Sequence, residues 1–209
     1  MKSNLQIRAI IFDFGGVLVD WNPRYLYRKL FADENAMENF FTEIGFPEWN
    51  TEQDRGRAFA EGVAEHSQKF PHHAEMIRAF DERWSESIGG EISETVEILR
   101  ALKRAGYALY GLSNWSAETF PRVRDQFAFF ELFDAIVLSG EVKLAKPDRR
   151  IFDLLLEKSG CRAEDCLFID DSETNVNAAR ALGFQTIQYQ SPEQLARELE
   201  QLGILERAA

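Results

Sequence analysis

The chain has 209 residues, of which 45% are hydrophobic and 17 are phenylalanine, so it can bury a sizeable core. Its 24 basic and 35 acidic side chains give a formal charge of −11, which argues against nucleic acid and against an anionic membrane surface as partners. We see no signal-peptide or membrane-spanning run, and Cys161 and Cys166 form no paired framework. We therefore expect a cytoplasmic protein; the oligomeric state is not encoded in a readable pattern.

The first predicted element is a strand over residues 8–13, an apolar run that ends in Asp13. A continuous apolar run of this length is typical of a strand buried on both faces. Gly15 and Gly16 follow, and glycine lets the backbone turn tightly and approach a ligand closely. Taken alone, an Asp before two glycines is equally typical of an ordinary turn. A loop is expected from here to residue 21.

The next part of the chain, from residue 23 to about residue 87, predicts helices and no strand. Apolar residues recur at helical spacing over 23–31, 34–44, 56–70 and 72–88, and residues 48–55 form a polar connector. We interpret this part as an all-helical block.

After residue 90, short strands alternate with helices. Strands are predicted at 107–112, 135–138, 166–169 and 186–189, and helices at 93–105, 117–129, 148–159, 173–182 and 192–202. This alternation predicts an α/β fold, a Rossmann-like parallel sheet with helices on both faces. The domains we expect are a core of residues 1–19 and 90–209 and an inserted α-helical cap of residues 20–89.

Four strand ends carry polar side chains, and in a parallel sheet these ends share one edge. The groups are Asp13, Ser113-Asn114, Lys146 and Asp170-Asp171. A carboxylate nucleophile surrounded by donors and a cation is what phosphoryl transfer through an aspartyl-phosphate needs. Mg²⁺ prefers one or two carboxylates together with substrate oxygens. Asp170-Asp171 is also typical of a helix N-cap. Lys143 is an alternative to Lys146 as the lysine of the site.

Together these motifs resemble the haloacid dehalogenase-like hydrolase superfamily over essentially the whole chain. The matching stretches are Asp13-Phe-Gly-Gly-Val-Leu18, Ser113-Asn114, Lys146-Pro147 and Phe168-Ile-Asp-Asp-Ser-Glu-Thr-Asn175. The helical block resembles the family's first-position cap, which closes over the site and selects the substrate.

The resemblance implies a magnesium site around the nucleophile. Asp13 would be both the nucleophile and a metal ligand, the Gly15 carbonyl oxygen and Asp171 would be further ligands, and Asp170 would lie beside the metal.

The resemblance also implies the phosphoryl-binding groups. Ser113 and the backbone at Asn114 would bind phosphoryl oxygens, with Gly16 close to the substrate. Lys146 would bridge the nucleophile and the phosphate, and Asn175 would orient the acidic loop.

One position departs from the family pattern. Most phosphatases of this superfamily carry a second Asp two residues after the nucleophile, where this chain has Gly15. That acid protonates the leaving group and then activates water, and such catalysis contributes roughly 10²–10⁴-fold. We expect a slow phosphatase, a preference for good leaving groups, or another acid, for which Asp20 is the nearest candidate.

The cap offers candidate substrate contacts in loops and at helix starts. They are Trp21, Asn22, Trp49, Asn50, Asp54 and Arg57. Other cap aromatics, including Tyr25, Phe80 and Trp84, are assigned to the cap core, and the three histidines show no metal-ligand spacing.

The function we predict is a Mg²⁺-dependent phosphatase of a small phosphorylated metabolite. The glycine variant of the first motif is similar to the branch containing the bacterial α-glucose-1-phosphate phosphatase, which suggests a sugar phosphate. Two alternatives stay open: a weak or inactive binding or regulatory protein, prompted by Gly15, and a metal-independent 2-haloacid dehalogenase. The paired acids Asp170-Asp171 count against the dehalogenase.

Overall fold

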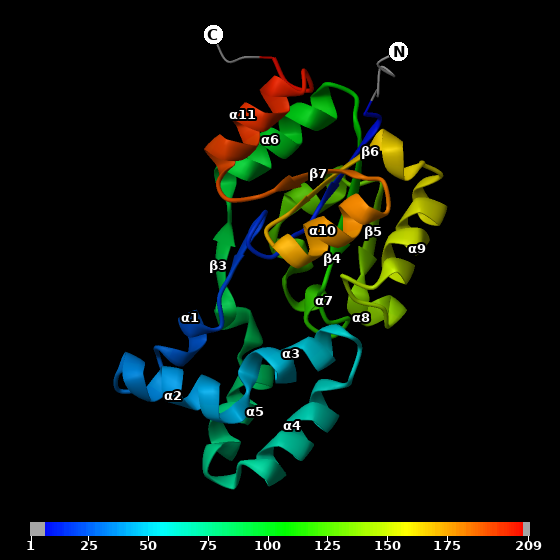
Figure 1. Ribbon diagram of the computed structural model, residues 1–209. Helices are drawn as coiled ribbons and strands as arrows, with labels where there is room; N and C mark the ends of the chain where they lie inside the picture. The colour runs from blue at the N-terminus through cyan, green and yellow to red at the C-terminus, as the bar shows by residue number, and fades with distance from the viewer. Residues whose placement is uncertain (1–6, 207–209) are drawn as a thin grey trace.

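The computed structural model describes residues 7–206, which form a parallel sheet with a helical block at one end of it (Figure 1). The sheet has five strands in the order β5-β4-β1-β6-β7, and every neighbouring pair is parallel. The strands are β1 (Ala9–Phe12), β4 (Ala108–Ser113), β5 (Ala135–Leu138), β6 (Cys166–Asp170) and β7 (Gln185–Gln188). The predicted Rossmann-like sheet is confirmed, with bounds shifted by one residue at several ends.

Both faces of the sheet are buried, as the apolar strands predict. Ile10 and Phe12 belong to one hydrophobic cluster, and Ala9 and Ile11 belong to the other. This alternation follows from the two-residue period of a strand, which sends successive side chains to opposite faces. Each cluster therefore needs a helical layer to cover it.

Two pairs of helices supply these layers. The cluster that contains Phe12 includes residues of α6 (Ser93–Arg104) and α11 (Pro192–Gln201). The cluster that contains Ile11 includes residues of α9 (Arg149–Ser159) and α10 (Glu173–Ala181). Figure 1 shows α6 and α11 packed together and away from α9. The three-layer α/β/α arrangement is thus as predicted.

The segment after β4 is less regular than predicted. In place of one helix over 117–129 it forms α7 (Phe120–Val123) and the 3₁₀ turns Arg124–Gln126 and Ala128–Leu132, and α8 (Ser139–Val142) follows β5. Phe127 is extended, with φ −123° and ψ 97°, and is buried together with Phe129 and Phe130. Burial of this aromatic run outweighs its helical spacing.

Helices α1 to α5 form the helical block in the lower half of Figure 1. They are α1 (Arg24–Tyr27), α2 (Glu34–Ile44), α3 (Phe46–Asp54), α4 (Phe59–Lys69) and α5 (Ala74–Glu82), with 3₁₀ turns at Pro71–His73 and Trp84–Ser87. No helix between residues 7 and 206 is long and apolar enough to cross a membrane.

The expected polar connector over 48–55 is wrong, because these residues belong to helix α3. Gly45, at φ 60°, ends α2 and directly precedes α3. The buried face of α3 carries Phe46, Trp49 and Gln53, and the Gln53 amide donates to the Trp49 carbonyl oxygen at 2.7 Å. A buried amide hides the apolar period on which the prediction depended.

A two-stranded antiparallel ribbon joins the helical block to the sheet. It consists of β2 (Val19–Trp21) and β3 (Ile88–Glu91), where the sequence predicts a loop and the end of a helix. The ribbon lies where the chain leaves the sheet and where it returns to it (Figure 1). Both strands are short, and β3 contains Gly89 and Gly90, so neither produces a strand pattern in the sequence.

Candidate active site

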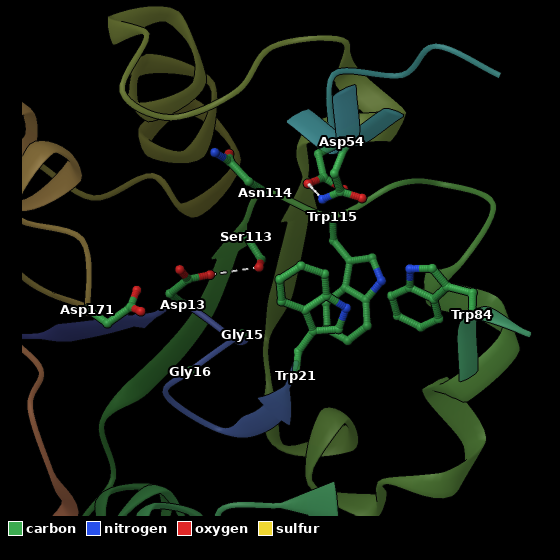
Figure 2. Close-up of a pocket in the computed structure, with 11 residues that line it drawn as sticks. Asp13, Gly15, Gly16, Trp21, Asp54, Trp84, Ser113, Asn114, Trp115 and Asp171 are labelled. Atoms are coloured by element: carbon green, nitrogen blue, oxygen red, sulfur yellow. Dashed lines mark hydrogen bonds between the residues drawn. The ribbon is translucent and has the colours of Figure 1, made fainter. Parts of the chain in front are cut away.

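A cavity of about 360 Å³ lies between the carboxyl ends of β1 and β4 and the helical block (Figure 2). It is lined by Asp13, Gly15, Gly16, Trp21, Asn50, Asp54, Trp84, Ser113, Asn114, Trp115 and Asp171. A site at this edge follows from the topology, because all five strands present their carboxyl ends there.

Asp13 directly follows β1, and its two carboxylate oxygens have different partners. Oδ1 accepts hydrogen bonds from the Ser113 hydroxyl and from the Phe14 backbone amide, both at 2.7 Å. Oδ2 lies 3.0 Å from the Lys146 ammonium. These contacts fix the carboxylate at the floor of the cavity, where Figure 2 shows it pointing toward Ser113.

The protonation of Asp13 depends on two opposing effects. Burial raises its pKa to about 7, while the Lys146 ammonium and the Ser113 hydroxyl act in the other direction. Burial lowers the pKa of Lys146, but the charges of Asp13 and Asp170 outweigh this, so the net shift is upward. Lys146 therefore stays protonated, and any additional cation beside Asp13 would favour the carboxylate.

Lys146 is held in place by contacts at both ends. Its ammonium group donates to Asp170 Oδ2 at 2.6 Å and to the Leu112 carbonyl oxygen at 2.8 Å. Its backbone amide donates to the side-chain oxygen of Asn114, whose amide donates back to the Lys146 carbonyl oxygen, at 2.8 and 3.0 Å. Lys143, the rival lysine, is exposed.

Asp13, Asp170 and Asp171 form a cluster in which carboxylate oxygens lie within 4.8 Å of one another. Asp170 is fully buried and accepts hydrogen bonds from Lys146, from the Ser172 backbone amide and from the Asn175 side chain. Asp13 and Asp171 line the cavity, and Asp170 does not. Such an all-oxygen donor set fits Mg²⁺ better than a soft metal.

Gly15 and Gly16, the two glycines that follow the Asp13-Phe14 pair, differ in whether a side chain would fit at their positions. Gly16 has φ +74°, and a Cβ there would lie 2.8 Å from Asp171 Oδ2. A Cβ at Gly15 would meet nothing within 4 Å. Gly16 is therefore required by the backbone and by the acidic cluster, whereas position 15 has room for a side chain.

Three of the predicted substrate contacts in the helical block line the cavity, namely Trp21 from β2 and Asn50 and Asp54 from α3. Asp54 accepts a hydrogen bond from the Asn50 side chain at 2.9 Å. The α3 helix brings both side chains to the cavity, because residues four apart share a helix face.

The other three predicted contacts do not line the cavity. Arg57 donates to Gln53 Oε1 at 2.7 Å and to the Trp49 carbonyl oxygen at 3.2 Å. Trp49 is buried in the helical block, and its indole donates to Gly62. Asn22 accepts from the backbone amide at the start of α1. Of these three only Trp49 belongs to α3, and it lies on the face of that helix that is buried in the helical block, whereas Asn50 reaches the cavity.

Two tryptophans of the cavity were missed. Trp84 was assigned to the cap core, and Trp115, directly after the Ser113-Asn114 motif, was given no role. Their ring centroids are 5.7 Å apart, and together with Trp21 they form an indole wall, seen in Figure 2. The position of Trp115 next to a motif was the one usable signal.

Asp20, the nearest candidate for the missing acid, does not line the cavity. Its carboxylate accepts from the Tyr25 hydroxyl at 2.8 Å and packs against the backbone of Gly89. Tyr25, which was assigned to the cap core, therefore lies beside the ribbon, where its hydroxyl binds Asp20.

A second cluster of possible ligands lies on the surface of the helical block. His72 and His73 place their Nε2 atoms 2.7 and 3.0 Å from the two oxygens of Glu43. The exposed Glu43 and His72 and the half-buried His73 therefore satisfy one another's hydrogen-bonding groups.

The family model for haloacid dehalogenase-like hydrolases matches residues 7–183. The chain belongs to this family. It is a hydrolase, and the motif resemblance is confirmed at the level of the family, though not for the glucose-1-phosphate branch.

Curated relatives of this haloacid dehalogenase-like hydrolase include phosphatases. The sesquiterpene phosphatase astK of Aspergillus oryzae is 28% identical over 197 residues, which cover 93% of this chain and 96% of the relative. The phosphorylated carbohydrates phosphatase of Thermotoga maritima is 30% identical over 186 residues, or 87% of this chain and 84% of the relative.

Solved structures agree with this assignment. A Bacteroides thetaiotaomicron enzyme of the family superposes with a TM-score of 0.72 at 26% identity, covering 93% of this chain and 98% of that one. The same enzyme in complex with magnesium and inorganic phosphate gives a TM-score of 0.66 at 26% identity and covers 88% and 95%.

Proposed function

We propose that this hydrolase is a Mg²⁺-dependent phosphatase that cleaves a small phosphorylated metabolite through an aspartyl-phosphate on Asp13. The observation that carries the proposal is the cavity floor, where Asp13, Ser113, Lys146 and Asp171 converge. The phosphatases among the relatives, and the magnesium and phosphate bound by the Bacteroides enzyme, support it.

In the proposed reaction Asp13 is the nucleophile. Oδ1 is committed to two hydrogen bonds, so Oδ2, beside Lys146, is the oxygen we assign to the attack on phosphorus. Ser113 and the backbone at Asn114 would hold the phosphoryl oxygens, and Lys146 would offset their charge.

Asp13, Asp171 and the Gly15 carbonyl oxygen would hold the metal, with Asp170 behind them. When bound, Mg²⁺ supplies charge neutralisation between the anionic nucleophile and the anionic phosphate. Gly16 would let the backbone pass close to this charge, since its position leaves no room for a Cβ.

We further propose that residues 20–89 are a cap domain that selects the substrate. The support is that Trp21, Asn50, Asp54 and Trp84 all reach the cavity from this part of the chain. An indole wall combined with a few polar groups suits a substrate with an apolar face and hydroxyl groups. A sugar phosphate fits this description, and the carbohydrate phosphatase relative supports it.

The test is phosphate release from nitrophenyl phosphate and from a panel of sugar and other metabolite phosphates. We expect turnover that requires Mg²⁺, stops with EDTA and is abolished in Asp13→Asn, whose circular dichroism spectrum stays native. If the wild type turns over no member of the panel, a binding or regulatory role replaces the proposal. Chloride release from 2-chloropropionate without metal would instead support a dehalogenase.

A further inference from the structure

The structure assigns a second role to Asp54. We propose that Asp54, delivered by helix α3 of the cap, is the general acid–base that Gly15 cannot supply. This inference rests on the phosphatase reaction proposed above and adds a catalytic residue to it. It also replaces the expectation that Asp20 serves as the acid.

The placement of Asp54 is the first argument. It lines the same cavity as Asp13 but enters from the opposite component of the fold, α3 rather than β1 (Figure 2). A leaving group bound against the cap lies on the side of the phosphorus away from the nucleophile. A proton donor for that group must therefore come from the cap side.

The fixation of the side chain is the second argument. The Asn50 amide donates to Asp54 Oδ2 at 2.9 Å, and the Ser116 backbone amide also donates to the carboxyl group. Both partners are N–H donors, so neither takes up the proton of a protonated carboxyl. That proton is left for a group in the cavity.

The protonation state agrees with this placement. Burial raises the pKa of Asp54 to about 8, and the charge of Asp13 acts in the same direction. At neutral pH the carboxyl is mostly protonated, as an acid for the first step must be. A pKa near the working pH also lets the same group act as a base in the second step.

Contacts between the cap and the core hold Asp54 at the cavity. Its backbone carbonyl oxygen accepts from the Ser139 hydroxyl, and nearby the Phe59 amide donates to Glu118 at 3.0 Å. Ser116 and Glu118 lie in the loop between β4 and α7, and Ser139 is the first residue of α8, so the helical segment that carries the acid is fastened to the core beside the cavity.

The two steps balance as follows. Asp13 attacks phosphorus, the bond from phosphorus to the substrate oxygen breaks, and that oxygen takes the Asp54 proton and leaves as an alcohol. Water then gives a proton to the Asp54 carboxylate while its oxygen attacks phosphorus. The bond to Asp13 breaks, its electron pair returns to the carboxylate, and inorganic phosphate leaves.

The test compares leaving groups in Asp54→Asn. We expect kcat/KM for glycerol phosphate to fall about 100-fold or more, and kcat/KM for dinitrophenyl phosphate to stay within about threefold, because dinitrophenolate leaves without a proton. With dinitrophenyl phosphate the variant should also release a burst of one equivalent of dinitrophenol, since water then attacks the phosphoenzyme without a base.

A rescue and a matched control sharpen the test. Gly15→Asp in the Asp54→Asn background should restore turnover of glycerol phosphate, because position 15 has room for a side chain at the cavity. Glu52→Gln removes an exposed carboxylate on the same helix and should leave both substrates unaffected.

Two outcomes would overturn the assignment of Asp54: an equal loss of kcat/KM for all leaving groups, which indicates substrate binding, or no loss at all. Failure of the proposed phosphatase function is distinct, because the wild type itself would then be inactive on dinitrophenyl phosphate with Mg²⁺.

Discussion

Replacing Lys146 with methionine tests the electrostatics of the site in the absence of catalysis. The ammonium group is buried and has three partners, Asp170 at 2.6 Å, the Leu112 carbonyl oxygen at 2.8 Å and Asp13 at 3.0 Å. Methionine keeps most of the volume but leaves two neighbouring carboxylates without their cation. Removing one partner from a buried ion pair costs about 3–5 kcal/mol.

The stability lost in Lys146→Met should grow as the pH rises. In the wild type, Asp13 has a pKa raised from 3.8 to about 7, so its contribution to stability is complete below pH 3.8 and is lost as the pH rises through 7. Lys146 opposes that rise, so its removal raises the pKa of Asp13 further. The variant should therefore continue to lose stability above pH 7, and its deficit should be larger at pH 8.5 than at pH 6.

The assay is urea unfolding with EDTA present, at both pH values, for the wild type, Lys146→Met and Lys146→Met/Asp170→Asn. In a thermal melt, the same loss of 3–5 kcal/mol in the free energy of unfolding would lower the melting temperature by roughly 6–20 °C in a chain of this size. The double variant should recover part of the loss, because it removes one of the unpaired carboxylates. A loss below about 1 kcal/mol, or an equal loss at both pH values, would refute the reasoning.

Further predictions concern the two glycines and Asp54. Gly16→Ala should lower stability by about 1–3 kcal/mol and weaken Mg²⁺ binding in calorimetric titration, because of the φ of +74° and the 2.8 Å approach to Asp171. Gly15→Ala is the matched control and should shift stability by less than about 0.5 kcal/mol; comparable losses in both would contradict this account. Asp54 has a pKa raised from 3.8 to about 8, so the stability it contributes is complete below pH 3.8 and lost as the pH rises through 8. The melting temperature of Asp54→Asn relative to that of the wild type should therefore rise as the pH rises from 4 to 8. A difference in melting temperature that stays constant over this range would show that the Asp54 carboxyl is ionised throughout.

The floor of the site was predictable because topology alone brings strand ends together. Once β1, β4 and β6 are recognised as parallel strands, Asp13, Ser113 and Asp171 must share an edge. Lys146 needed the family motif in addition, because it lies in a loop.

The roof of the site was less predictable, because it depends on which faces of short helices point inward. The buried face of α3 includes the amides Asn50 and Gln53, and this segment was predicted to be a connector, so the sequence could not show that Trp49 points into the helical block while Asn50 points into the cavity. Trp84 shows the other difficulty. A large aromatic at a cavity wall and one in a core have the same sequence pattern, and only packing distinguishes them.

The ribbon of β2 and β3 has a consequence for how such a chain can diversify. Val19 lies opposite Glu91, so the chain leaves the sheet and re-enters it at neighbouring positions. The ends of the intervening segment stay joined whatever its length, and lengthening a closed loop adds little entropic cost. A different helical segment could therefore be inserted at this one point while Asp13 and the sheet beneath it are inherited unchanged, and under the role proposed for residues 20–89 such an exchange would change the substrate range.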